Sequence, residues 1–439
     1  MNSVLKIFNY RFYLKELLLL LFTFFLIEGI FSWIFIHNSI IIEGYQKLLS
    51  LFIFGFMLYS FSHLKNSERI IVGLFTMLLV KLVFESLNKY DSVFRQLTMF
   101  TVLFPVIFTL FIKYILRSME LDLLGFMAKF YLATYIVFMV LFGRGFSFNL
   151  ESVDMDDYGP FSGDTRVIHA SHIFMMIVPF LWYLNQLINT KKNKYLLPFL
   201  FCFVVILVHQ HRSVWSSTLV ALFFYLISTL RNRLQNLSRL GNISIVAGTI
   251  ILVGYFFVAN LFPGFIEFLS ERFSEIFDPS KEGSTGNFRT QQREVYFDLF
   301  LQRPLFGWTF EGFEMPNPLV DWWPPNTGQH FHEGYMEMLF YHGIVGLILK
   351  YGILFYFLIR VFSKKLSAES IILLSFGISG MVFSFNYVLP LIFWGFVGMC
   401  LYYLEKDKML PTENKSDTKV IEKVPPVTYR EFRTNRIRS

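Results

Sequence analysis

The chain has 439 residues, of which 54% are hydrophobic and only 16% are charged. Soluble domains carry about 25% charged residues, so this composition excludes an ordinary soluble domain. The apolar residues fall into solid runs of roughly 18 to 22, long enough to cross a hydrocarbon core of about 30 Å as helices. The runs do not alternate polar and apolar residues as barrel strands do. We therefore expect an all-α polytopic membrane protein.

Taken in chain order, the hydrophobic runs predict twelve spans, centred on residues 16–36, 46–63, 69–87, 98–116, 121–142, 170–189, 194–209, 213–230, 243–262, 339–362, 368–386 and 388–404. The first lacks a small-residue cleavage site and is expected to be a retained anchor. The spans divide the chain into an N-terminal bundle of about nine spans (1–262), a long polar loop (263–338), about three C-terminal spans (339–404) and a charged, disordered tail (405–439).

Positive residues alternate between the connections, and this pattern predicts the orientation. Every second connection is basic, through Lys6, Arg11 and Lys15; Lys65 and Arg69; Lys113 and Arg117; Lys191, Lys192 and Lys194; Arg231, Arg233 and Arg239; Lys364 and Lys365; and the tail. By the positive-inside rule both termini are cytoplasmic, which agrees with an even number of spans. Three polar segments then share the outer face, namely residues 143–169, 209–212 and 263–338.

Charged residues and cysteines inside the predicted spans can each be explained by a structural role as well as by a functional one. Glu28, Lys81, Glu85 and Lys129 lie in apolar runs, where charges face a cavity or a partner; Lys81 and Glu85, four apart, can neutralise each other. Cys202 and Cys400 lie in separate spans and are expected to be small buried hydrophobes with no disulfide.

The long loop contains two arginines on one helical face. Residues 264–277 suggest an amphipathic interfacial helix, and a second helix is predicted over 288–303, ended by Pro304. Arg289 and Arg293 are four apart in the first turns of this second helix, where guanidinium forks and free N–H groups favour an anion such as a diphosphate. Alternatively they pair with Glu294, Asp298 or lipid phosphates. Arg212, at the outer end of a span, either binds an anion or snorkels to the interface.

Further along the chain, an aromatic stretch and three histidines are candidates for contacts with a substrate. The stretch 308–323 is rich in Trp, Phe and Pro, which either anchor the protein at the interface or stack on sugar rings. His330, His332 and His342 suggest a metal site, but the zinc signature requires a histidine where Met336 stands, so no metal is expected. His332, at a loop-to-helix junction, is either a general base or a histidine satisfied by loop carbonyls.

The C-terminal block resembles the O-antigen ligase and Wzy-type polymerase superfamily of bacterial envelope enzymes. In that family an arginine is followed about fifteen residues later by a Pro-Leu-Phe-Gly-like turn, and a His-Asn-x-x-Leu-like motif precedes Gly-Ile-Ile-Gly by eleven residues. Here the matching residues are Arg289, Pro304-Leu305-Phe306-Gly307, His332-Glu333-Gly334-Tyr335-Met336 and Gly343-Ile344-Val345-Gly346. Arg212 resembles the arginine of the family's Ser-Arg motif, and Arg166 resembles an arginine further upstream.

Two positions depart from the pattern. Glu333 stands where asparagine is usual, which leaves the partner of His332 open, and Arg293 stands where tryptophan is frequent, which leaves open whether it or Arg289 is the key cation. Glu333 and Tyr335 are candidates for contacts with the acceptor or with His332.

The resemblance implies a GT-C-like glycosyltransferase without a cofactor. An undecaprenyl-diphosphate-linked glycan would be the donor, at the outer leaflet of the bacterial inner membrane. Arg212, Arg289, Arg293 and Arg166 would bind the diphosphate, and His332 would deprotonate a hydroxyl of a glycan or glycolipid acceptor. Nothing in the composition points to nucleic acid. The ligase reading is preferred to a Wzy-type polymerase of O-antigen, capsule or exopolysaccharide, and a lipid-linked oligosaccharide flippase is the more distant alternative.

Overall fold

The computed structural model describes residues 4–7, 10–13, 27–36, 39–93, 95–119, 123–142, 168–190, 192–209, 211–232, 285–308 and 331–409, with short helical pieces between 241 and 270. Several predicted features fall wholly or mostly outside these residues: the acidic part of the 143–169 connection with Arg166, the span 243–262, the helix 264–277, the aromatic stretch after Trp308, His330, and nearly all of the tail.

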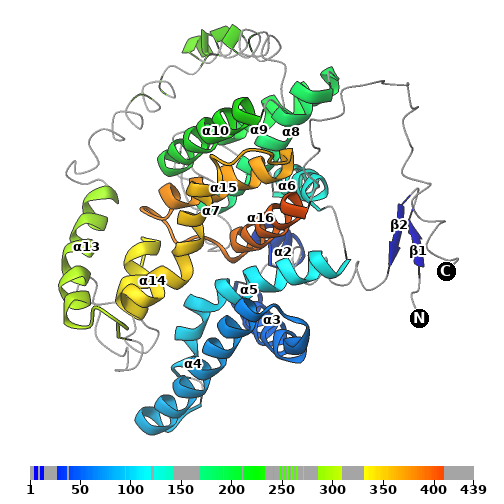
Figure 1. Cartoon of the computed structure of the whole chain (residues 1–439). Helices are drawn as coiled ribbons and strands as arrows, with labels where there is room; N and C mark the ends of the chain where they lie inside the picture. The colour runs from blue at the N-terminus through cyan, green and yellow to red at the C-terminus, as the bar shows by residue number, and fades with distance from the viewer. Residues whose placement is uncertain are drawn as a thin grey trace, which may run out of the picture.

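Helices form almost all of the described structure (Figure 1). A short antiparallel hairpin that the hydropathy pattern did not predict pairs Val4 with Tyr13 and Ile7 with Tyr10. The elements are β1 (Val4–Ile7), β2 (Tyr10–Tyr13), α2 (Gly29–Phe35), α3 (Ser39–Tyr59), η2 (Phe61–His63), α4 (Asn66–Tyr90), α5 (Leu97–Met119), α6 (Leu124–Phe142), α7 (Ala170–Met175), α8 (Ile177–Thr190), η3 (Asn193–Tyr195), α9 (Leu196–Val208), α10 (Arg212–Asn232), α13 (Thr285–Gln302), α14 (Gly334–Arg360), α15 (Ala368–Phe383) and α16 (Leu391–Met409).

Multi-pass membrane character is confirmed. Within the described residues, six helical stretches are long and apolar enough to cross a membrane: 66–90, 99–118, 124–141, 170–190, 212–232 and 334–360. Residues 193–208 and 368–383 form shorter apolar helices. The predicted total of twelve spans, the GT-C-like topology and the orientation stay predictions.

The C-terminal helices form the centre of the bundle. α15 and α16 pack against each other, with α10 beside α15 and α5 beside α16 (Figure 1). α16 approaches α5 closely because Gly398 has no side chain; a Cβ there would meet the Thr109 carbonyl. The Thr109 hydroxyl donates to the Trp394 carbonyl at 3.0 Å. Small residues and interhelical hydrogen bonds are the usual means of helix packing in lipid.

One end of the bundle carries a network of ion pairs. Glu68, at the start of α4, lies 2.8 Å from Lys113 and 3.2 Å from Arg117, both near the end of α5. Glu405, near the end of α16, pairs with Lys65 and lies 3.2 Å from Lys113. Two of the basic connections therefore meet at the same end, as alternating loop charge requires of connections on one face.

Charges placed within the predicted spans have local partners. Glu28, expected inside the first span, precedes α2 and accepts from the Phe31 N–H at 2.5 Å. Glu85 lies 3.7 Å from Lys89, and the Lys129 ammonium lies 5.5 Å from the centre of the Trp182 ring. The expectation for the cysteines is confirmed, since Cys202 and Cys400 are both buried and unpaired.

α14 is bent sharply at Gly343, which the hydropathy pattern did not reveal. Gly343 has φ 62° and ψ −161°, so the helix divides into 334–342 and 344–360. The predicted span 339–362 runs across this bend, and α14 begins within the predicted loop 263–338. Hydropathy reports only which residues are apolar, and here the apolar run continues through the bend.

Candidate functional site

The two glycine motifs of the C-terminal block bind each other through the backbone. Ile344 N–H donates to the Pro304 carbonyl at 2.9 Å, and Val345 N–H donates to the Leu305 carbonyl at 3.1 Å. These donors are the first N–H groups of the 344–360 helix, which have no partner within that helix. The Pro304–Gly307 turn therefore caps the second half of α14.

Both close approaches require glycine. Gly307 has φ 64°, and a Cβ on it would meet the Phe340 carbonyl. A Cβ on Gly343 would meet the Leu305 carbonyl. The turn is also tied to the first half of α14, because Trp308 N–H donates to the Phe340 carbonyl at 2.9 Å. The motif spacing thus reflects a turn docked onto a helix bend.

His332 lies just before α14 and is held by α13. The helix predicted over 288–303 is confirmed as α13, and Gln292 on it is buried. His332 N–H donates to Gln292 Oε1 at 3.3 Å, and Gly334 N–H donates to the Ser384 carbonyl at 3.0 Å. The His332 side chain is half-buried. Contacts from both α13 and the end of α15 fix its backbone.

Arg293 forms a two-pronged ion pair with Glu333. Arg293 Nε donates to Glu333 Oε2 at 3.1 Å, and Arg293 Nη2 donates to the other carboxylate oxygen. The hydrogen bond to Glu333 raises the pKa of Arg293. Glu333 is almost fully buried, whereas half of the Arg293 side chain is exposed. The sequence alternatives for Arg293 did not include this partner.

Arg289, one helical turn before Arg293, has a different environment. Its guanidinium lies 5.0 Å from the centre of the Tyr387 ring, and its Nε is buried with no hydrogen-bond partner among the described residues. The same Tyr387 ring also contacts the segment before α7, because the His169 ring packs edge-on against it with 5.8 Å between the ring centres. Tyr387 therefore connects α13 with the segment before α7.

Arg212 is the first residue of α10. The residue before it, His211, contacts the segment that precedes α7. The buried side chain of His211 donates from Nε2 to the carbonyl of Ile168 at 2.7 Å. Ile168 is the residue that precedes His169. A continuous series of contacts thus runs from the start of α10, through Ile168–His169 and Tyr387, to Arg289. Arg166 lies outside the described residues.

Two sequence candidates are engaged in packing. The Tyr335 hydroxyl donates to the Met381 carbonyl at 2.9 Å, and its ring packs on Tyr351 at 4.6 Å. His342 is buried, and its Nε2 donates to the Met99 carbonyl at 3.0 Å, which holds α14 against α5.

An apolar groove of about 950 Å³ begins at the Arg293–Glu333 pair. α10, α13, α14 and α15 form its walls, and besides the ion pair and Glu294 the residues that line it are mainly aliphatic and aromatic: Val220, Phe224, Phe297, Tyr335, Met336, Leu339, Leu347, Phe355, Ile378, Met381, Val382 and Phe385. A ligand with a long hydrocarbon part and a charged end fits this arrangement.

Sequence reasoning missed Gln292, His169 and Tyr387. Gln292 shares a helix with the two arginines, but nothing in its local sequence indicates that it meets His332. Tyr387 lies in the short polar break between the last two spans, in Asn386-Tyr387, and that break is the signal that could have found it.

These features define a multi-pass helical membrane protein in which an apolar groove ends beside Arg293, one helical turn from Arg289. Residues 197–351 match the family model of O-antigen ligase. The matched segment contains Arg212, Arg289, Arg293 and His332 together with both docked motifs. No curated protein matches the chain. The family assigns a glycosyl-transferring activity of ligase or polymerase type, with a lipid-linked glycan and an acceptor as partners.

Proposed function

We propose that the protein transfers a glycan from undecaprenyl diphosphate to an acceptor hydroxyl at the outer leaflet of the inner membrane, as an O-antigen ligase does. The observation that carries this proposal is the apolar groove that ends at the Arg293–Glu333 pair, one turn from Arg289. The prenyl chain occupies the groove and the diphosphate reaches the arginines. A lipid-linked donor matches this pairing of hydrocarbon and anion sites.

Arg289 is the preferred cation for the diphosphate. The charge of Arg293 is largely offset by Glu333, whereas the buried Arg289 Nε–H has no acceptor among the residues that the structure describes. As the bond between the anomeric carbon and the diphosphate oxygen breaks, negative charge grows on that oxygen, and fixed guanidinium groups stabilise it. Arg212, and Arg166 by resemblance, complete the set. These cations take the place of a metal ion, and transfer is metal-independent.

His332 acts as general base. It takes the proton of the acceptor hydroxyl while the hydroxyl oxygen attacks the anomeric carbon from the side opposite the diphosphate. The products are the glycosylated acceptor, with inverted configuration, and undecaprenyl diphosphate. The hydrogen bond from the His332 backbone to Gln292 supports this role, because it fixes the histidine relative to the arginine helix.

A Wzy-type polymerase, which joins undecaprenyl-linked repeat units, uses the same donor site and differs only in the acceptor. A transporter of lipid-linked oligosaccharide accounts for the spans and the groove. It does not account for a histidine held against the helix that carries Arg289 and Arg293.

The test is a mass-resolved transfer assay on the purified full-length protein with undecaprenyl-diphosphate-linked oligosaccharide, with and without a second acceptor. Product that requires the second acceptor establishes a ligase. Multimers from the donor alone establish a polymerase. An unchanged donor in both samples would contradict the proposal.

A further inference from the structure

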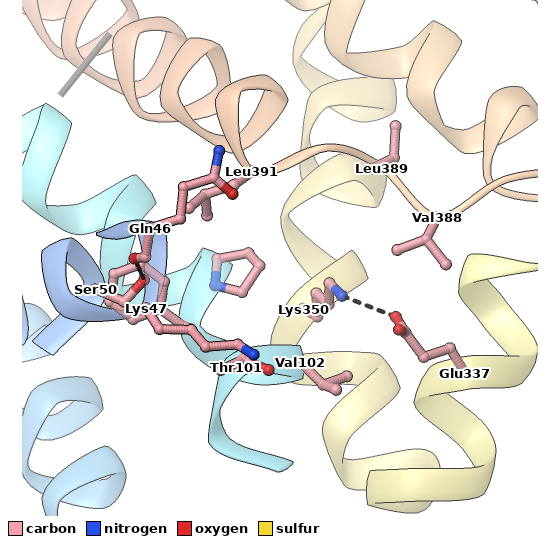
Figure 2. Close-up of a pocket in the computed structure, with 12 residues that line it drawn as sticks. Gln46, Lys47, Ser50, Thr101, Val102, Glu337, Lys350, Val388, Leu389 and Leu391 are labelled. Carbon is pink, nitrogen blue, oxygen red and sulfur yellow. Dashed lines mark hydrogen bonds and ion pairs between the residues drawn. The ribbon is translucent and has the colours of Figure 1, made fainter. Parts of the chain in front are cut away.

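A second cavity lies on the other side of α14 from the groove. It measures about 310 Å³ and is lined by residues of α3, α5, α14 and the segment that leads into α16 (Figure 2). Ligand sites range from about 300 to 1,000 Å³, so this one accommodates a single small ring rather than a long chain. Its wall combines polar groups from α3 with apolar side chains: Gln46, Lys47, Ser50, Thr101, Val102, Phe104, Pro105, Glu337, Lys350, Val388, Leu389 and Leu391.

The cavity contains a buried ion pair that exists only because α14 bends. Glu337 and Lys350 are thirteen residues apart, which corresponds to roughly 20 Å along a straight helix. The bend at Gly343 brings Lys350 Nζ to 3.5 Å from Glu337 Oε2. Figure 2 shows the two charged ends pointing toward each other, across the cavity from Gln46.

Within the described part of the chain, this ion pair leaves one carboxylate oxygen without a hydrogen bond, while Lys350 Nζ also lies over the Tyr351 and Trp394 rings. Lys350 is only 2% exposed, yet 3.5 Å exceeds the usual 2.7–2.9 Å of a charged hydrogen bond. Glu337 Oε2 is buried without a hydrogen-bond partner among the described residues. Buried charges are costly unless they are paired and hydrogen bonded, and charges at membrane depth usually mark a functional site.

The pair also indicates the ligand's chemistry. The charges of Glu337 and Lys350 cancel, and Lys47, which also lines the cavity, adds one positive charge. A diphosphate placed against the ion pair would meet the Glu337 carboxylate, which opposes its binding there. The ammonium offers donors and the carboxylate offers acceptors, side by side, and adjacent hydroxyl groups of a sugar can satisfy both. Phe104 and Pro105 supply apolar surface for the less polar face of such a ring.

The location connects this cavity with the proposed active site. Glu337 lies in the first turn of α14, four residues after Glu333, so the cavity and the groove flank the same short helix directly after His332. We propose that the cavity binds one neutral sugar residue of the acceptor glycan, opposite the lipid groove. This rests on the proposed function, and it specifies a substrate class for a site that the donor does not occupy.

The experiment measures binding and transfer separately in the full-length protein. The binding probe is the free oligosaccharide of the acceptor, released by mild acid from the acceptor glycolipid of the producing cells. The transfer assay uses the intact lipid-linked glycan. The variants are Glu337→Gln, which removes the charge, and Val102→Phe, which fills the cavity without touching the ion pair. Val204→Phe is the matched control, because Val204 lies on the partly exposed surface of α9.

We expect the wild-type protein and Val204→Phe to bind the free oligosaccharide equally. Glu337→Gln and Val102→Phe should each weaken binding by about tenfold or more, which corresponds to about 1.4 kcal/mol. A wild-type protein that transfers glycan but does not bind the probe would overturn the cavity assignment alone. Equal binding by Val102→Phe and the wild type would do the same. Absence of transfer by the wild type would contradict the proposed function instead.

Discussion

Arg293 on α13 and Glu333 before α14 are joined by parallel hydrogen bonds across forty residues of sequence. This pair fixes the arginine helix to the residue next to His332. It also offsets the charge of one of the two neighbouring arginines, whereas the Nε of the other, Arg289, has no hydrogen-bond partner within the described part of the chain.

Loss of Arg289 should therefore lower transfer more than loss of Arg293. For Arg289→Ala we expect a fall in kcat of about 100-fold, the magnitude typical for removal of one group that stabilises developing charge. Arg303→Ala, directly after the end of the same helix and with its guanidinium over the Trp308 ring, is the matched control and should stay near wild type. Equal losses in the Arg289 and Arg303 variants, measured by initial rates, would remove Arg289 from the site.

The aromatic ring of Tyr387, and not its hydroxyl group, should hold Arg289 in position for donor binding. Tyr387→Phe keeps the aromatic face under the guanidinium and is expected to retain wild-type activity, whereas Tyr387→Ala loses a contact of about 0.5–2 kcal/mol. Donor titrations should show a higher KM for the alanine variant only. Equal behaviour of the two variants would indicate that the stacking has no role in donor binding.

Replacement of His332 should affect chemistry and spare the fold. A general base contributes about 10²- to 10⁴-fold, so His332→Ala should lower kcat by that amount. Thermal unfolding and binding of the lipid-linked donor should stay unchanged, because the backbone N–H of residue 332 donates the bond to Gln292 and the substitution keeps it. His63→Ala, at the η2 turn, is the control. An active His332→Ala protein would require another base.

The bend in α14 should be sensitive to one methyl group. Gly343→Ala places a Cβ against the Leu305 carbonyl at a positive φ, a strain of about 1–3 kcal/mol. Gly352→Ala, on the regular second half of α14, meets only an ordinary contact with Ile348 and should be neutral or slightly stabilising. Thermal unfolding in detergent compares the two; a Gly343→Ala protein as stable as the wild type would contradict the docking described above.

The Arg293–Glu333 pair should show measurable coupling. Because Glu333 is buried and the geometry is two-pronged, we expect a coupling free energy of about 1 kcal/mol or more, above the median for surface pairs. A double-mutant cycle with Arg293→Ala and Glu333→Ala, read by thermal unfolding, measures it. A coupling near zero would show that the pair does not hold α13 to α14.

The sequence by itself determined the membrane class, most helix positions and the candidate histidine and arginines. Hydropathy depends on composition within one segment, and helical spacing places Arg289 and Arg293 on one face without knowledge of the rest of the chain. The match of motif spacing likewise needs only residue order, and it located the segment that the family comparison also identifies.

Only the tertiary structure showed which side chains contact one another. The Glu333 partner of Arg293, the ring beneath Arg289 and the ion pair between Glu337 and Lys350 all join residues that are distant in sequence. The bend at Gly343 illustrates the reason. A glycine within an apolar run is compatible with a straight helix, and it bends here because the Pro304 and Leu305 carbonyls bind the N–H groups that the bend exposes. Such contacts depend on how separate segments pack, which no local pattern records.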